Sequence, residues 1–335
     1  MTDMPTRRTF LRAMALAGAG NHFGRIATAV AEPSPETSRI RLVKFPGICL
    51  APQYVAEELL RGEGFTEVQY VEGPGGAAAV YDQVSAGAVD FTQWYGVPFI
   101  EQIDEGKPVV ILAGVHVGCQ QIVAAERIRS IRDLKGKAIA VTYASPATSI
   151  LIAMLTYVGL DHRKDIRFVD YPATETVQLL AEGRIDAVSA LPPLSQELRA
   201  KKIGHPLVDT AVDRPWSQYF CCMFIGHRDF VRKHPVATKR ALRAILKADQ
   251  LCALEPERVA RSIVDRGFTK NYDYALQTMK DVPYGKWRQY DPEDMVRFYA
   301  LRLREAGLIK ATPQKILADG TDWRFLKELK KELKT

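Results

Sequence analysis

The sequence predicts an α/β protein with two lobes joined by two crossover strands. Strand-like and helix-like segments alternate from Ile40 to Ser189, which is typical of mostly parallel sheets with helices on their faces. A helix, a glycine, a hydrophobic residue and an aspartate that opens a strand occur at 80–90 and again at 176–186. Two copies of this pattern indicate two similar lobes and argue against one long sheet.

The elements of the first lobe follow from hydrophobic periodicity and from glycine and proline breaks. Alternating apolar residues predict an opening strand, which a Pro-Gly pair ends, and glycines end each of the helices that follow. The predicted strands are 40–45, 67–71, 89–91 and 109–113, and the predicted helices are 51–60, 77–85 and 97–105.

The second lobe repeats this order, with strands at 137–141, 166–170 and 185–189 and helices at 145–158 and 174–181. Two apolar runs without a helix of their own, 119–125 and 218–226, are predicted to pair as crossover strands that form a hinge. The chain beyond Gly226 is predicted to be mostly helical. We therefore expect a first part of lobe 1 at 38–118, lobe 2 at 119–221, and the return to lobe 1 with the C-terminal helices at 222–335.

The N-terminal segment has the pattern of an export signal. Thr6–Arg12 contains paired arginines followed by phenylalanine and leucine, a weakly apolar stretch follows at 13–20, and small residues end at Ala31. This order predicts a twin-arginine signal peptide at 1–31, export by the twin-arginine machinery and cleavage near Ala31. We expect a soluble periplasmic protein, since no later run reaches the ~18 apolar residues that a membrane span needs.

Composition argues against several functional classes. The formal net charge is +7, and the export segment contributes +3 of it, so the rest is weakly basic and no nucleic acid partner is expected. The cysteines show no C-x-x-C spacing, and their odd number argues against a disulfide framework, while a single bridge stays open. No metal or cofactor is expected, because the histidines are scattered too. The five cysteines are Cys49, Cys119, Cys221, Cys222 and Cys252.

Several motifs, taken in order, resemble a known family. Residues 128–137 read I-R-S-I-R-D-L-K-G-K before a strand, and the other matches are Gly159–Leu160, Gly183 to Asp186, Asp229–Phe230 and Pro235. Together they resemble the periplasmic substrate-binding proteins of ABC importers of the nitrate/sulfonate/taurine type. That group is related to the pyrimidine-precursor-binding and pyrimidine-precursor-synthase-like family. The resemblance covers essentially the whole chain after the export segment.

The resemblance implies a fold and a function. It implies the type II periplasmic-binding-protein fold and a monomer without enzymatic activity. Such a protein captures a small ligand between its lobes. It then delivers the ligand to a membrane permease with its ATPase subunit. Aromatic residues and helix N-termini in this chain favour a small organic anion of the sulfonate, carboxylate or aromatic acid type, and a pyrimidine stays an open alternative.

Loops at the carboxyl ends of the strands are expected to line a cleft between the lobes. These loops are 45–52, 92–96, 115–119, 142–148, 190–193 and 215–219. Gly47, Cys49 and Leu191 are candidate ligand residues because they lie in the first and fifth of these loops.

The loop 142–148 is the most informative of the six. Ser145 and Pro146 suit the start of a helix, whose N–H groups, with the Thr142 and Thr148 hydroxyls, are able to hold a carboxylate, sulfonate or phosphate. A serine that only caps its helix is the alternative interpretation.

Aromatic and basic residues complete the set of candidates. Trp94 and Tyr95 follow a strand and suit stacking on a planar ligand, and Trp216 suits closing the cleft from the other side. His116 and Arg214 are candidate partners of an acidic group. Packing between the lobes, a buried structural histidine and an Arg214 already paired with Asp213 are the respective alternatives.

Two other functions were weighed against a binding protein. A pyrimidine-precursor-synthase-like enzyme of the same fold has a cysteine cluster around a phenylalanine, which is thought to bind iron and to which residues 221–224 are weakly similar. Here only Cys221 and Cys222 are adjacent, and strand alternation points them to opposite faces. A periplasmic ligand sensor is the second alternative.

Overall fold

The computed structural model describes residues 32–73, 76–141 and 146–333, and the structural statements below concern these ranges. The predicted signal peptide at 1–31 and the candidate ligand residues Thr142 and Ser145 lie outside them. Within these ranges, no helix combines the length and the apolar character that crossing a bilayer requires.

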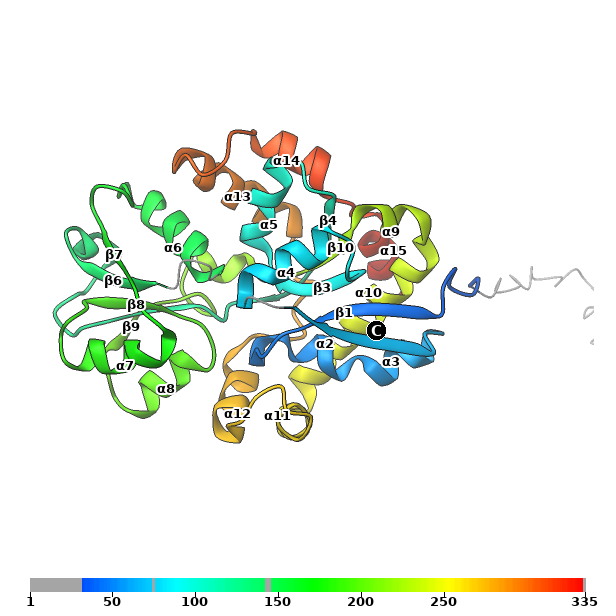
Figure 1. The fold of residues 1–335 in the computed structure, drawn as a ribbon, viewed down its shortest axis with the longest axis horizontal. Helices are drawn as coiled ribbons and strands as arrows, with labels where there is room; N and C mark the ends of the chain where they lie inside the picture. Colours follow the sequence, from blue (N-terminus) through cyan, green and yellow to red (C-terminus); the bar gives the residue numbers. More distant parts are fainter. Residues whose placement is uncertain (1–31, 74–75, 142–145, 334–335) are drawn as a thin grey trace, which may run out of the picture. The chain divides into compact units, whose positions relative to one another are not determined.

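The first sheet has five strands in the order β2-β1-β3-β10-β4 (Figure 1). Strand β1 runs parallel to β2 and β3, whereas β10 runs antiparallel to both of its neighbours. The strands are β1 (Arg39–Lys44), β2 (Glu67–Glu72), β3 (Phe91–Tyr95), β4 (Val109–Val117) and β10 (Phe220–His227).

The second sheet has the equivalent order, β7-β6-β8-β5-β9. Strand β6 runs parallel to β7 and β8, and β5 runs antiparallel to β8 and β9. The strands are β5 (Gln121–Ala124), β6 (Ala138–Val141), β7 (Arg167–Asp170), β8 (Ala187–Ala190) and β9 (His205–Asp209). We call residues 39–117 and 220–333 the first lobe and residues 121–209 the second lobe.

The two runs predicted to pair as hinge strands lie in different sheets. The run 119–125 contains β5, which pairs with β8 and β9, and the run 218–226 contains most of β10, which pairs with β3 and β4. Both runs are apolar because each strand is inserted between two others and largely buried. The chain itself crosses between the sheets at 118–120 and at 210–219, which we call the two crossovers.

Helices cover both sheets as the alternation predicted. In the first lobe they precede β4 or follow β10, and the long predicted helix 51–60 is two short ones. They are η1 (Ile48–Leu50), α2 (Ala51–Val55), α3 (Glu57–Gly62), α4 (Gly76–Ser85), α5 (Gly96–Asp104), α9 (Arg228–Lys233), α10 (Pro235–Leu254), α11 (Pro256–Asp265), α12 (Tyr272–Asp281), α13 (Pro292–Glu305), α14 (Pro313–Gly320) and α15 (Arg324–Glu332).

In the second lobe, α6 lies on one side of the sheet and α7 and α8 lie on the other (Figure 1). Its helices are η2 (Ile131–Leu134), α6 (Pro146–Tyr157), α7 (Ala173–Ala181) and α8 (Leu194–Ala200), and η3 (Trp216–Gln218) lies in the second crossover.

The repeated helix–glycine–aspartate pattern has the same role in each lobe. Gly87 and Gly183 have φ values of +68° and +70°, the left-handed conformation that glycine adopts at low cost. The aspartate after each of them accepts a hydrogen bond from the backbone of the neighbouring central strand. The distances are 2.7 Å from Arg41 N to Asp90 Oδ2 and 2.8 Å from Ala138 N to Asp186 Oδ2. The pattern therefore joins each helix–strand unit to the adjacent parallel strand, β1 in the first sheet and β6 in the second.

Candidate ligand-binding site

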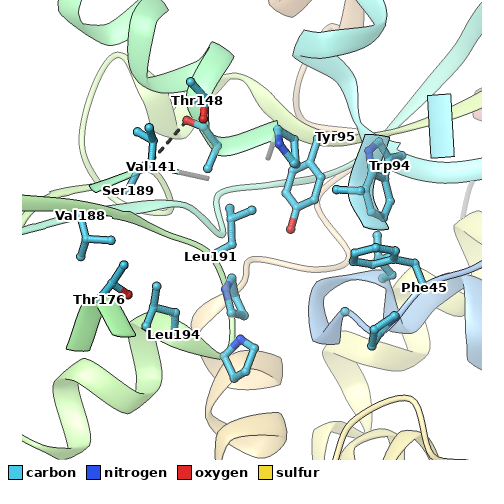
Figure 2. A pocket seen from close by; sticks show the side chains of 18 of the residues that line it. Phe45, Trp94, Tyr95, Val141, Thr148, Thr176, Val188, Ser189, Leu191 and Leu194 are labelled. Atoms are coloured by element: carbon cyan, nitrogen blue, oxygen red, sulfur yellow. Dashed lines mark hydrogen bonds between the residues drawn. The ribbon is translucent and has the colours of Figure 1, made fainter. Parts of the chain in front are cut away.

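A pocket of about 220 Å³ is lined by residues of both lobes (Figure 2). The first lobe contributes Phe45, Pro46, Gly47, Leu50, Ala77, Trp94 and Tyr95. The second lobe contributes Ala140, Val141, Pro146, Ala147, Thr148, Thr176, Val188, Ser189, Leu191, Pro192, Pro193 and Leu194.

The wall from the first lobe is aromatic. Trp94 and Tyr95 end strand β3, and their rings lie edge to face with centroids 5.3 Å apart. Phe45 follows β1 and meets the Trp94 ring edge to face at 4.9 Å. Figure 2 shows the Phe45 and Trp94 side chains next to each other at one end of the pocket. Such a surface suits a flat or apolar ligand body.

Two buried glutamines hold this wall in place. Gln53 N donates to Gln93 Oε1 at 3.1 Å, and Gln93 N donates to Gln53 Oε1 at 2.8 Å. The Gln53 amide also donates to the Val43 carbonyl, and the Gln93 amide donates to the Cys49 carbonyl. These four bonds join α2 and η1 to β1 and β3, so the segment 45–50 has a fixed position beside Trp94.

Cys49 and His116 lie behind this wall and do not line the pocket. The Cys49 carbonyl accepts from His116 Nε2 at 3.0 Å and from the Tyr284 hydroxyl at 3.2 Å, and its Sγ lies 3.0 Å from the Tyr95 hydroxyl. The other ring nitrogen of His116, Nδ1, lies 3.3 Å from the Val117 carbonyl, so both nitrogens are occupied by backbone groups. His116 is therefore a buried structural histidine, which was the alternative to its binding an acidic ligand.

The wall from the second lobe offers hydroxyl groups and a helix end. Thr148 lies in the first turn of α6, and Thr176 lies in α7 on the same side of the pocket as Val188 (Figure 2). Ser189 lies one residue before the end of β8, and its hydroxyl accepts from Gln120 Nε2 at 2.6 Å and donates to the Ala147 carbonyl at 3.3 Å. The first turn of α6 therefore borders the pocket with a hydroxyl on each side.

The described lining of the pocket carries no formal charge. It includes no aspartate, glutamate, lysine, arginine or histidine. Burial raises the pKa of Tyr95 well above its ordinary value, and the nearby cysteines raise it further, so its hydroxyl stays protonated. Polar recognition here depends on hydroxyls, on backbone groups and on the dipole of α6.

The structure brings five of the predicted ligand residues to the pocket and puts four elsewhere. Those at the pocket are Gly47, Trp94, Tyr95, Thr148 and Leu191, and those elsewhere are Cys49, His116, Arg214 and Trp216.

Arg214 and Trp216 lie in the second crossover, which does not border the pocket. The Arg214 side chain is exposed. Trp216 is buried against Tyr157 of α6 and Phe298 of α13, with ring centroids 5.2 and 5.8 Å away. Trp216 therefore packs between elements of the two lobes, which was the alternative to its closing the cleft.

Several lining residues lie outside the predicted loops. Ala77 and Thr176 belong to the helices that follow β2 and β7, and Val141, Val188 and Ser189 are at the ends of strands. The start of each helix after a strand was the available signal, because such helix starts lie at the same sheet edge as the predicted loops.

A cluster of cysteines lies behind the aromatic wall. The Sγ atoms of Cys119 and Cys221 are 2.8 Å apart, and the Sγ atoms of Cys49, Cys119 and Cys222 all lie within 4.8 Å of one another. The expectation that Cys221 and Cys222 face opposite sides is wrong. The pairing of β10 with β4 shifts register at this point, so Cys221 is an extra residue in a β-bulge and the alternation is broken.

A model of the NMT1-like family matches residues 34–265. A protein of Brucella abortus that is named as a binding protein is 24% identical over 177 residues, which are 52% of this chain and 54% of that protein. The chain thus spans about half the length of this curated relative.

Solved structures resemble the whole fold at low sequence identity. The periplasmic nitrate-binding protein NrtA of Synechocystis has a TM-score of 0.69 at 16% identity over 90% of both chains. The alkanesulfonate-binding protein SsuA of Xanthomonas axonopodis, bound to MOPS, has a TM-score of 0.66 at 16% identity over 88% of this chain and 99% of that one. The desulfurization enzyme DSZB reaches 0.58 at 15% identity over 87% and 98%. These likenesses confirm the expected periplasmic-binding-protein fold.

Proposed function

This chain belongs to the NMT1-like family, and from that premise we propose that it is the periplasmic solute-binding component of an ABC importer. It captures a small organic anion between its two lobes and delivers it to a membrane permease that works with an ATPase subunit. The observation that carries the proposal is the pocket to which both lobes contribute a wall. Closing two lobes over a ligand excludes water and creates a surface that a partner is able to recognise.

The lining favours a ligand with an apolar body and one acidic end, of the sulfonate, carboxylate or aromatic acid type. The body packs against Phe45, Trp94 and Leu191, and the acid faces the first turn of α6 beside Thr148. A helix N-terminus and hydroxyls stabilise an anion without a full positive charge. This arrangement replaces the predicted role of Arg214, which does not line the pocket.

The same lining supports binding without covalent chemistry. An enzyme of this fold needs a nucleophile, an acid or a base at its substrate, and the described lining has neither a cysteine nor an ionised side chain. Cys221 and Cys222, on which the enzyme alternative depended, lie behind the wall. We therefore propose that the ligand leaves the pocket unchanged.

A thermal-shift and calorimetry screen of the purified chain tests this function. The panel contains hexanesulfonate, taurine, benzoate and benzenesulfonate, with nitrate and bicarbonate as small inorganic controls. We expect an organic acid to raise the Tm, since a ligand at 100 times its Kd adds ~2.7 kcal/mol, and the inorganic ions to have a smaller effect because they leave the apolar wall empty. Turnover of the bound acid, or no response to any organic member, would contradict the proposal.

We also propose that residues 1–31 direct export by the twin-arginine route, with cleavage near Ala31, and that the exported protein is a monomer. The paired Arg7 and Arg8 support this route. Replacing both by lysine is expected to keep the precursor in the cytoplasm, as cell fractionation would show, and light scattering of the exported form measures its mass. Normal export of the double variant would remove the twin-arginine assignment.

A further inference from the structure

We propose that Cys119 and Cys221 form an oxidation site, at which a disulfide joins the first crossover to strand β10 behind the aromatic wall. The Sγ atoms of this pair lie 2.8 Å apart, although the residues are 102 positions apart in the chain. Formation of a bond, about 2.05 Å long, therefore needs less than 1 Å of approach.

The two thiols lie where the chain passes between the sheets. Cys119 is the middle residue of the first crossover, and Cys221 is the second residue of β10, which the second crossover enters. The crossovers already run side by side, because Thr210 N donates to the Gln120 carbonyl at 3.0 Å and Gln120 N donates to the Thr210 hydroxyl at 3.1 Å. A disulfide would add a covalent link to these hydrogen bonds.

The backbone at both cysteines is unusual. Cys119 has a φ of +105°, a conformation that costs a residue with a Cβ on the order of 1–3 kcal/mol, and glycine would avoid this cost. Cys221 is the extra residue of the bulge in β10. The two thiols that meet thus both come from irregular positions of the backbone.

Exposure selects this pair among the five cysteines. The exposed fractions of Cys119 and Cys221 are 6% and 7%, whereas Cys49, Cys222 and Cys252 are fully buried. Cys221 also lines a small cavity with Gly118, Trp216 and Tyr219. Cys119 and Cys221 are therefore slightly more accessible to solvent than the three fully buried cysteines.

The protonation states suit thiol–disulfide exchange. Burial raises the pKa of Cys221, but hydrogen bonds from the Cys119 and Cys222 thiols outweigh burial and lower it below its ordinary value. Burial and its bond to Cys221 raise the pKa of Cys119. The pair thus holds one thiolate as nucleophile beside one thiol as proton donor.

The reaction uses a low-molecular-weight disulfide as its oxidant, such as oxidised glutathione. The Cys221 thiolate attacks one sulfur, forms a mixed disulfide and releases a glutathione thiolate. Cys119 loses its proton to that thiolate and attacks Cys221 Sγ, and the second glutathione leaves. The protein loses two electrons and the one proton of Cys119, and one oxidised glutathione becomes two reduced molecules, the second of which takes its proton from solvent.

A disulfide here would restrict bending at the first crossover. Strand β10 is fixed in the first sheet, so a bond from Cys221 fixes the backbone of Cys119. The crossover residues 118–120 must change their φ and ψ angles if the lobes open. We therefore expect the oxidised form to open and close more slowly over its ligand, a consequence that rests on the proposed function.

Alkylation of the full-length chain tests the site itself. The reduced native protein is incubated with oxidised glutathione, denatured in N-ethylmaleimide and weighed by mass spectrometry. We expect three adducts in place of the five that free cysteines give, and a proteolytic map that joins Cys119 to Cys221. Oxidation should also raise the Tm by about 5 °C or more, as for other disulfides that close long loops.

Matched variants make the outcome decisive. Cys252→Ser should still form the bridge and keep two adducts, whereas Cys221→Ser should keep four and show no Tm change on oxidation. Five adducts after native incubation, a bond to Cys49 or Cys222, or thiols protected by co-purified zinc or copper would each overturn the proposal. A negative ligand screen leaves this mass measurement unaffected, so failure of the proposed function and failure of the oxidation site are distinguishable.

Discussion

The two lobes have the same strand order but hold their pocket walls in different ways. The wall of the first lobe consists of aromatic side chains on a strand buried at every position, and paired glutamines fix it from behind. The wall of the second lobe consists of hydroxyls and a helix end on a sheet whose outer strands β7 and β9 are both partly exposed, whereas in the first sheet β2 is partly exposed and β4 is fully buried. One topology thus provides a rigid shaped surface on one side and a polar, less deeply packed surface on the other.

The lobes also differ in the acidic groups that they bury. Glu63, Asp90 and Asp249 are all buried in the first lobe, and among the described residues of the second lobe no acidic side chain is buried to this extent. The C-terminal helices of the first lobe cover its sheet and exclude water. Stability should therefore be more sensitive to polar substitutions in the first lobe than in the second.

The largest effect is expected where the aromatic wall is fastened. Gln93→Leu leaves the Gln53 N–H buried without its acceptor and removes a bond to the Cys49 carbonyl. We expect the free energy of unfolding to fall by about 3 kcal/mol, as measured by urea titration, since each unsatisfied buried group costs on the order of 1–3 kcal/mol. Gln178→Leu, at an exposed position of α7, is the control and should stay within about 0.5 kcal/mol of the parent.

Substituting the equivalent aspartates Asp90 and Asp186 compares how much each lobe's stability depends on a buried carboxylate. The Asp90 side chain is 3% exposed and bound to Arg41, whereas Asp186 is 16% exposed and paired with the more exposed Arg127. We expect Asp90→Ala to cost about 2–3 kcal/mol and Asp186→Ala about 1 kcal/mol, because a lost partner costs more where water cannot replace it. Equal losses in urea unfolding would remove the distinction between the lobes.

Substitutions in the two pocket walls are expected to weaken ligand binding to different degrees. Phe45→Ala removes apolar contact area, and Thr148→Val replaces a hydroxyl at the helix end with a methyl group of similar size. With the best acid of the panel above, calorimetry should show about tenfold weaker binding for Phe45→Ala and about threefold for Thr148→Val. Leu254→Ala, at a position that is 67% exposed, serves as control. An unchanged Kd in both pocket variants would argue that the ligand binds elsewhere.

The smallest effect concerns the pH dependence of the first lobe. Burial raises the pKa of Asp249 well above its ordinary value, and the bond from Gly285 N lowers it only in part. The unfolded chain ionises at its ordinary pKa, so this carboxyl makes the fold less stable as pH rises above that value. Asp249→Asn should gain about 1 kcal/mol at pH 7.5 and lose this gain toward pH 4, by thermal unfolding. A gain that is independent of pH would contradict protonation of Asp249.

The fold could be predicted from local patterns because each lobe repeats them. The Gly87 and Gly183 motifs identified two equivalent units, and the structure explains both through the aspartate that follows. The prediction that the runs 119–125 and 218–226 pair with each other was wrong. An apolar run is equally consistent with a hinge pair and with a central strand, and only tertiary pairing shows that β5 and β10 are inserted into different sheets.

The site was predicted less completely than the fold. Trp94, Tyr95 and Thr148 were found because they follow strands or begin a helix. The prediction that Arg214 binds the ligand was wrong, because a charged residue close in sequence to a predicted cleft does not have to point into that cleft. The cysteine cluster could not be foreseen, because strand alternation separates Cys221 from Cys222 and nothing in the sequence announced a bulge.

The insertion of β10 between β3 and β4 means that the first lobe is discontinuous in the chain. When the first two hundred residues have been synthesised, strands β1, β2, β3 and β4 of the first sheet are present. Strand β10, which pairs with both β3 and β4, is still missing. A truncated protein that ends before β10, or a transplanted segment that lacks it, therefore does not contain the complete first sheet.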